Sequence, residues 1–251
     1  MKPASSLLVA SSALAAVCFL AACQDGGSKA KPGAAGGATE KPAPKGTAKI
    51  EGTVKFTGTA PPPEPWGGAG NADCKAKHEA TIQLVRVTDG KLEDAFVYVK
   101  EGLPPGSHEP PATKPTLDQK NCEFSPRVIG VVVGQEIDAG NSDAFMHNVK
   151  SPEFNQGFPS AGVKRALTLN EPKVMSPIVC DVHPWMRAYA GVMTHPYFQV
   201  TKSDGAFSIE GLVDGNYTVA AWHEKLGEVE VKAVAASAAT PGKAELAFAP
   251  R

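Results

Sequence analysis

Glycine and proline interrupt this chain so often that long helices have little room in it. The 251 residues include 25 glycines and 22 prolines, and the apolar segments between them are short. Within these segments apolar and polar residues alternate, so that Ile50, Val54 and Phe56 fall on one face of the segment 50–56. A period of two residues is typical of a strand with one buried face. No segment has a convincing amphipathic helical pattern, and the sequence therefore predicts an all-β fold.

The most informative chemical motif is the run CDVHPWM, which places Cys180, His183 and Met186 within seven residues. A thiolate, an imidazole and a thioether together suit one copper ion, because copper(I) favours sulfur and copper(II) favours imidazole. A second histidine, His147, lies 33 residues before Cys180, between short segments that are predicted to be strands. The sequence therefore predicts a mononuclear copper site with His147, Cys180, His183 and Met186 as its ligands.

Other interpretations of this motif fit less well. A zinc site usually takes several cysteines or histidines in paired spacings, and a catalytic zinc rarely recruits methionine. A dinuclear copper centre would need a second cysteine in the loop, and no cysteine follows Cys180. Taken singly, Cys180, His183 and Met186 are each more often ordinary packed or surface residues. Their combination with His147 favours copper.

The stretch from Leu117 to Val192 resembles a cupredoxin, with the loop pattern of amicyanin and plastocyanin. In that family a histidine followed by Asn-Val precedes a Cys-x-x-His-x-x-Met loop, and this chain has His147-Asn148-Val149 followed by CDVHPWM. The resemblance implies a Greek-key β-sandwich that holds one type 1 (blue) copper ion. It also implies that the Asn148 side chain supports backbone N–H groups that donate to the cysteine sulfur.

The same resemblance implies that the protein carries single electrons between a donor and an acceptor redox protein. The family's loop histidine, here His183, is the expected exit for electrons, and Pro184 and Trp185 beside it would form an apolar docking patch. Ordinary core packing is the alternative role for Trp185. Related copper enzymes place a histidine next to the ligand cysteine, whereas neither neighbour of Cys180 is a histidine. We therefore expect a carrier and not an enzyme.

The amino terminus predicts export from the cytoplasm. Lys2 precedes the apolar stretch from Leu7 to Ala22, which ends in Leu-Ala-Ala before Cys23. The pattern is typical of a signal peptide, residues 1–22, followed by a lipidated cysteine, and it resembles a bacterial lipoprotein. An ordinary signal peptide that is cleaved elsewhere is the alternative. We expect a periplasmic or cell-surface protein held by its lipid at a bacterial membrane, with the outer membrane slightly favoured.

Residues 23–47 consist almost entirely of Gly, Ala, Pro, Lys, Ser and Thr, with no apolar pattern to bury. This composition predicts a flexible linker between the lipid and the folded part of the chain. The whole chain has 25 basic and 26 acidic residues, which gives a net charge of −1 at pH 7. This balance argues against nucleic acid as a partner.

Five cysteines are present, and three of them have an expected role. Cys18 leaves with the signal peptide, Cys23 takes the lipid and Cys180 takes the metal. Cys74 and Cys122 remain and are expected to form a disulfide, which an oxidising compartment permits. Two unpaired buried thiols are the alternative.

The segments on either side of the cupredoxin-like stretch resemble a carboxypeptidase regulatory-like domain, a small transthyretin-like sandwich. That family's motifs occur in order as Gly52-Thr53-Val54, Ala95 to Val99, Thr201 to Phe207 and Gly215 to Val219. We therefore expect a discontinuous domain, residues 48–112 and 195–250, with a cupredoxin domain, residues 113–194, inserted in it. The competing arrangement is consecutive domains, in which residues 50–99 supply extra cupredoxin strands.

A second functional hypothesis is a β-sandwich lipoprotein that binds carbohydrate or a partner protein and has a structural or vestigial copper site. It rests on aromatic residues that are expected to be exposed, namely Trp66, Tyr197 and Trp222. Copper storage is a third hypothesis, but storage favours methionine-rich sites and the chain has only five methionines.

Overall fold

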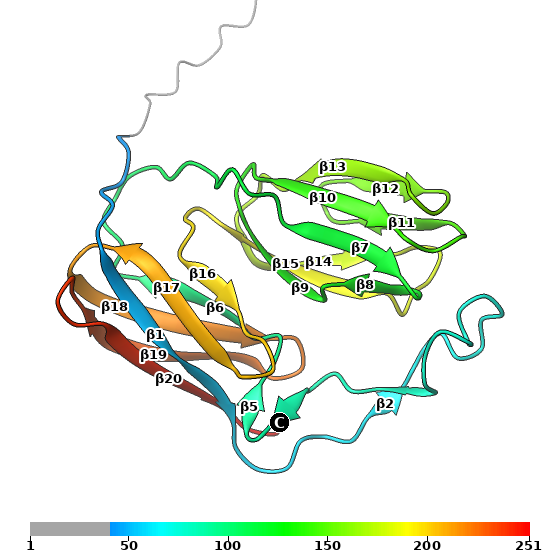
Figure 1. Cartoon of the computed structure of the whole chain (residues 1–251), viewed down its shortest axis with the longest axis horizontal. Coiled ribbons are helices and arrows are strands. Elements are labelled where there is room, and N and C mark those ends of the chain that lie inside the picture. Colours follow the sequence, from blue (N-terminus) through cyan, green and yellow to red (C-terminus); the bar gives the residue numbers. More distant parts are fainter. Residues whose placement is uncertain (1–40) are drawn as a thin grey trace, which may run out of the picture. The chain divides into compact units, whose positions relative to one another are not determined.

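The computed structural model describes residues 41–251, so the predicted signal peptide, Cys23 and most of the predicted linker lie outside the described residues. Throughout residues 41–251 the regular secondary structure is strand (Figure 1). The prediction of an all-β fold is confirmed. Within the same range no helix is long and apolar enough to cross a membrane.

Two sheets share the core of a first sandwich. One sheet contains, in spatial order, β17 (Ala206–Leu212), β1 (Ala48–Phe56), β5 (Lys91–Leu92) and β4 (Val87–Thr88), with β20 (Gly242–Phe248) paired in parallel to β1. The other contains β16 (Phe198–Val200), β6 (Phe96–Glu101), β18 (Gly215–His223) and β19 (Gly227–Ala236). Ile50, Val54 and Phe56 of β1 are all buried in this core, as the alternation predicts.

Two further sheets form a second sandwich around a separate core. One contains, in spatial order, β13 (Lys164–Thr168), β10 (Glu136–Asn141), β7 (Thr116–Lys120) and β8 (Glu123–Ser125). The other contains β12 (Asn155–Phe158), β11 (His147–Lys150), β14 (Lys173–Val179), β15 (Arg187–Met193) and β9 (Val128–Val132). These strands come from residues 116–193, between β6 and β16 of the first sandwich.

The two sandwiches touch through the outer faces of one sheet each. Phe96 and Tyr98 of β6 pack in one cluster with Val128 of β9 and Met193 of β15. Because the opposite face of β6 points into the core of the first sandwich, the first four residues of this strand are all buried. A continuous apolar run such as Phe96 to Val99 is typical of a strand that is covered on both faces.

A long connection between β1 and β4 carries two short paired strands, β2 (Glu64–Pro65) and β3 (Thr81–Ile82). Although it starts and ends in the first sandwich, its residues Trp66 and Cys74 belong to the core of the second. Cys74 forms a disulfide with Cys122, in the turn between β7 and β8. The structure thus contains the disulfide that the cysteine count predicts.

The last residues of the predicted linker are hydrogen-bonded to the first sandwich and to a nearby loop. The Ala43 N–H donates to the Ser107 carbonyl oxygen over 3.0 Å, and the Gly46 N–H donates to the Gly211 carbonyl oxygen over 3.1 Å. The end of the predicted linker is therefore held by backbone hydrogen bonds.

Candidate metal centre

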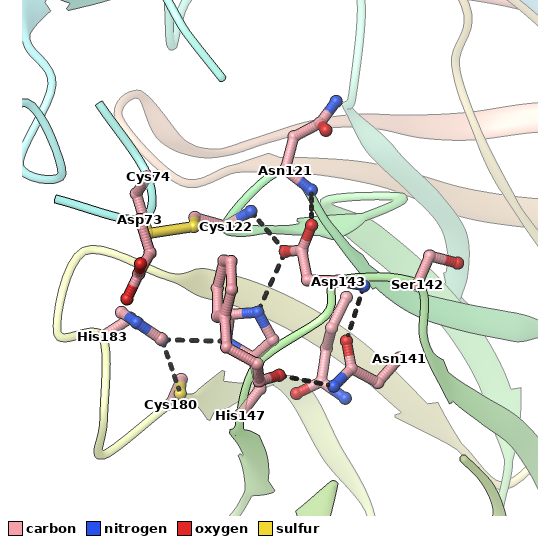
Figure 2. Close-up of polar contacts among 12 residues, drawn as sticks. Asp73, Cys74, Asn121, Cys122, Asn141, Ser142, Asp143, His147, Cys180 and His183 are labelled. Carbon is pink, nitrogen blue, oxygen red and sulfur yellow. Dashed lines mark hydrogen bonds and ion pairs between the residues drawn. A yellow bond between two sulfur atoms is a disulfide. The ribbon is translucent and has the colours of Figure 1, made fainter. Parts of the chain in front are cut away.

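Neighbouring strands of the second sandwich bring the predicted ligands to one end of a sheet (Figure 2). His147 is the first residue of β11, and Cys180 directly follows the last residue of the antiparallel neighbour β14. The turn between β14 and β15 carries His183 and Met186. The pairing of β11 with β14 therefore joins a ligand from one part of the sequence to the three that lie together in the CDVHPWM run.

The cysteine sulfur and one nitrogen of each histidine converge. Ligand atoms of His147, Cys180 and His183 all lie within 4.8 Å of one another. The two Nδ1 atoms are 2.8 Å apart, and the Cys180 sulfur lies 3.9 Å from Nδ1 of His183. Met186 packs in the same hydrophobic core as Cys180. The structure thus gathers three of the predicted ligands around one point and holds the fourth in the same turn.

All four of these side chains are shielded from solvent. Their exposed fractions are 0% for His147, 2% for Cys180, 3% for His183 and 1% for Met186. Burial lowers the pKa of both histidines because it disfavours the charged imidazolium, and the neighbouring His147 lowers the pKa of His183 further. Burial therefore favours the neutral form of both rings, which is the form that binds a metal ion.

Asp143 orients His147. Its carboxylate lies 3.0 Å from Nε2 of His147 and accepts the backbone N–H groups of Asn121 and Cys122 over 2.9 and 2.8 Å. Burial alone would raise the pKa of Asp143, but the hydrogen bonds from Cys122, His147 and Asn121 together lower it. An ionised carboxylate accepts the Nε2 proton, so the lone pair on Nδ1 of His147 faces Cys180 and His183.

The role of Asp143 is not apparent in the sequence. An aspartate four residues before a candidate ligand is the only local signal, and this spacing is too common to be specific. The contact depends on the turn between β7 and β8, which supplies two N–H donors from a distant part of the chain.

Asn148 holds the chain around the Cys180 sulfur. Its backbone N–H donates to Cys180 Sγ over 3.5 Å, and its side-chain oxygen accepts the Asp181 N–H over 2.6 Å. Its side-chain nitrogen donates to Asn155 over 2.7 Å. Asn148 thus directs one N–H at the sulfur, while its side chain holds the backbone of the residue that follows Cys180.

Backbone hydrogen bonds close the turn that carries three of the ligands. The Met186 N–H donates to the His183 carbonyl oxygen over 2.9 Å, and the Cys180 N–H donates to the Met186 carbonyl oxygen over 3.4 Å. The turn therefore fixes the relative positions of Cys180, His183 and Met186 without help from a metal ion.

The two residues of the predicted docking patch lie in different surroundings. Pro184 is exposed, whereas Trp185 is half-buried. The Trp185 indole N–H donates to the Cys122 carbonyl oxygen over 3.2 Å, and its ring lies edge-on to that of Trp66, with centroids 5.9 Å apart. His183 itself is only 3% exposed. A docking role for Pro184 and Trp185 stays a prediction.

The donor set fits copper better than other common metals. Two imidazole nitrogens and a cysteine sulfur face one point, with a thioether in the same turn, and hard cations such as calcium or magnesium would require oxygen ligands. Asp143, the nearby carboxylate, is turned toward Nε2 of His147 and two backbone N–H groups. A site with these donors suits a copper ion that alternates between the copper(I) and copper(II) oxidation states.

No protein-family model and no curated protein sequence matches this chain. Solved structures that are similar to part of it include a purple cupredoxin from Nitrosopumilus maritimus, at 19% identity over 32% of this chain and 99% of that one, with a TM-score of 0.29. Amicyanin from Paracoccus versutus is 18% identical over 38% of this chain and 96% of that one, with a TM-score of 0.27.

A copper-containing nitrite reductase from Thermus scotoductus is also similar. It is 19% identical over 37% of this chain, with a TM-score of 0.28, and this chain spans only 25% of its length.

Proposed function

We propose that this protein is an extracytoplasmic type 1 copper protein that carries single electrons between redox partners. The observation that carries the proposal is the convergence of His147, Cys180 and His183 in a buried site whose turn also supplies Met186. A lipid anchor at Cys23, outside the described residues, would hold the protein at a bacterial membrane, periplasmic or at the cell surface.

The residues around the site suit electron transfer, which needs a ligand frame that changes little between oxidation states. Copper, when bound, supplies the one-electron couple. The closed turn of Cys180, His183 and Met186 and the hydrogen bond from Asp143 fix the ligands in advance. Burial excludes water, and the Asn148 N–H directed at the sulfur tunes the stability of the thiolate. None of these groups has to move when an electron arrives or leaves.

Apolar residues next to both histidines offer a contact surface for a redox partner. Met146, which precedes His147, is 51% exposed, and Val182, which precedes His183, is 47% exposed. The Phe145 ring lies between these regions, with its centroid 5.2 Å from that of His147 and 5.8 Å from that of His183. Donor and acceptor proteins with apolar contact surfaces would fit this position.

The alternative of a carbohydrate- or protein-binding sandwich loses much of its support. It rests on exposed aromatic residues, but Trp66 and Tyr197 are each only 5% exposed and Trp222 is partly buried. Trp222 packs against Tyr189, with ring centroids 5.0 Å apart, where the two sandwiches meet. These rings serve internal packing and are not arranged as a sugar-binding platform.

Voltammetry of the copper-loaded protein tests the proposed carrier role. We expect a reversible one-electron couple, and we expect the Met186→Leu variant to keep its intense colour while its midpoint potential rises. Loss of this weak fourth donor reduces the binding of copper(II) more than that of copper(I), because the more highly charged ion gains more from an added donor. A tenfold difference between the two losses corresponds to about 60 mV for one electron.

Met193→Leu provides the matched control, because Met193 is also buried but packs between the sandwiches. Its potential should equal that of the unmodified protein. An irreversible couple, or equal potentials in all three proteins, would contradict an electron carrier with Met186 as ligand.

A further inference from the structure

The connection between β1 and β4 covers the part of the candidate site that carries His183. We call residues 64–82, from β2 to β3, the cap. Its Trp66 is buried and lies edge-on to Trp185, whose ring centroid is 5.1 Å from that of His183. The rings of Trp66, Trp185 and His183 thus form a continuous packed row from the cap to a predicted ligand.

The backbone of the cap lies directly against Trp185, without room for water or for another side chain. A Cβ added to Gly67 would lie 2.7 Å from Cβ of Trp185, and one added to Gly68 would lie 2.8 Å from its Cε2 atom. Real Cβ atoms do not approach other atoms this closely, so only glycine allows this contact. The contact requires glycine at both positions, which indicates close packing and not a loop resting loosely on the surface.

A covalent bond fastens the cap beside the site (Figure 2). Cys74 of the cap is joined to Cys122, and both sulfurs belong to fully buried residues. Cys122 also touches the site in two other ways, because its N–H donates to Asp143 and its carbonyl oxygen accepts the Trp185 indole N–H. One residue therefore links the cap to the carboxylate that orients His147 and to the tryptophan that packs on His183.

A further residue of the cap, His78, also holds it in place. Nε2 of His78 is hydrogen-bonded to the Asn121 carbonyl oxygen, and the ring of His78 packs on Trp66 with centroids 4.5 Å apart. The cap is thus attached through Trp66, Cys74 and His78.

We propose that residues 64–82 form a closed cap that controls the entry of copper to the site and its loss, and that the Cys74–Cys122 disulfide keeps the cap closed. The inference rests on the proposed function as a copper protein. The ligand side chains are at most 3% exposed, so an ion reaches them only when a covering segment opens. The cap is the covering segment that connects strands of the other sandwich, and it is held by the disulfide, the row of rings and the hydrogen bond of His78. Copper therefore enters before the disulfide forms or during a local opening of the cap.

Alkylation of Cys180 tests the cap without any metal. In the full-length, metal-free protein, iodoacetamide should modify the buried Cys180 thiol slowly, as measured by mass spectrometry of the peptide that contains it. In a Cys74→Ser, Cys122→Ser double variant we expect modification to be at least about tenfold faster. Without the cross-link, local opening of the cap costs less free energy and is more frequent. Trp66→Leu keeps the disulfide and should give a smaller increase.

Release of copper(I) to bathocuproine disulfonate tests the same cap in the loaded protein. We expect the rates to rise in the same order, from the unmodified protein through Trp66→Leu to the double variant. Trp222→Leu is the matched control, since Trp222 is a partly buried tryptophan at the contact between the sandwiches and should leave both rates unchanged.

The outcomes separate the cap from the copper function. If Cys180 is modified at the same rate in all folded variants, the cap does not control access, and an opening on the Phe145 side would replace it. Circular dichroism identifies the variants that fold. If the double variant does not fold, the alkylation rate of Trp66→Leu tests whether the cap controls access. If the unmodified protein binds no copper through a thiolate, the proposed function fails, while the alkylation rates still test whether the cap closes the site.

Discussion

Removal of the disulfide is expected to lower the free energy of unfolding by about 4 kcal/mol, measured on the metal-free Cys74→Ser, Cys122→Ser variant. The two cysteines are 48 residues apart in sequence. A cross-link that closes a loop of this length removes many conformations from the unfolded chain, and this is the main source of its stabilising effect. Urea denaturation followed by circular dichroism measures the change.

Cys180→Ser is the matched control for this prediction. Cys180 is buried like the paired cysteines, but it is the cysteine within residues 41–251 that stands outside the disulfide. Its replacement in the metal-free protein alters a buried thiol without removing a cross-link, so the loss of stability should be clearly smaller. Equal losses in the two variants would mean that the cross-link contributes little and that the buried thiol environment dominates.

Between pH 6.5 and pH 4 the free energy of unfolding is expected to fall by about 3 kcal/mol for each of two buried histidines, at about 1.4 kcal/mol per pH unit. Burial lowers the pKa of His195 and His223 to about 4. The nearby His108 lowers the pKa of His195 further, while Glu224 opposes the effect of burial on His223. Nε2 of His223 has no hydrogen-bond partner among the described residues, so protonation there would leave a buried charge without compensation.

The direction of this change in stability follows from the pH at which the folded and the unfolded states take up protons. In the unfolded chain each histidine binds a proton near pH 6.5, but in the folded protein it does so only near pH 4. Between these values the unfolded state holds more protons, so acidification favours unfolding and the stability is fully present above pH 6.5. Below pH 4 both states are protonated, and these two residues add no further loss.

Asparagine variants separate this effect from other acid titrations. Nδ1 of His195 accepts the Tyr197 N–H and Nδ1 of His223 accepts the Lys225 N–H, and an asparagine oxygen can replace either acceptor. We expect His195→Asn and His223→Asn each to flatten the dependence of stability on pH in urea denaturation series between pH 7 and pH 4. An unchanged slope in the double variant would contradict the assignment of acid sensitivity to these residues.

The strands and the grouping of the candidate ligands could be predicted because their signals are local. Alternation over seven residues is enough to place Ile50, Val54 and Phe56 on one face of β1, and three of the four predicted ligands lie within one turn. His147 is distant from that turn in sequence, but the Asn148 and Val149 that follow it match the His-Asn-Val pattern on which the resemblance to cupredoxins rests. The sequence therefore contains most of the candidate site.

Features that depend on contacts between distant segments could not be predicted. Trp66 has the sequence context of an exposed aromatic, between prolines and glycines, yet it is buried against Trp185 of another sandwich. The same limit applies to Asp143, whose partners come from the turn at Cys122. In β19 the alternation of more buried and more exposed residues shifts after Val231, because Ala233 adopts a positive φ of 56°. No residue type in this segment indicates such an irregularity.

The visible absorption and electron paramagnetic resonance spectra of the protein, after addition of one equivalent of copper(II), test the copper site most directly. We predict an intense thiolate-to-copper band with a narrow hyperfine splitting, both of which disappear in the Cys180→Ser variant because the sulfur ligand is lost. A colourless protein with loosely held copper, or a coloured Cys180→Ser variant, would contradict a type 1 site formed by His147, Cys180, His183 and Met186.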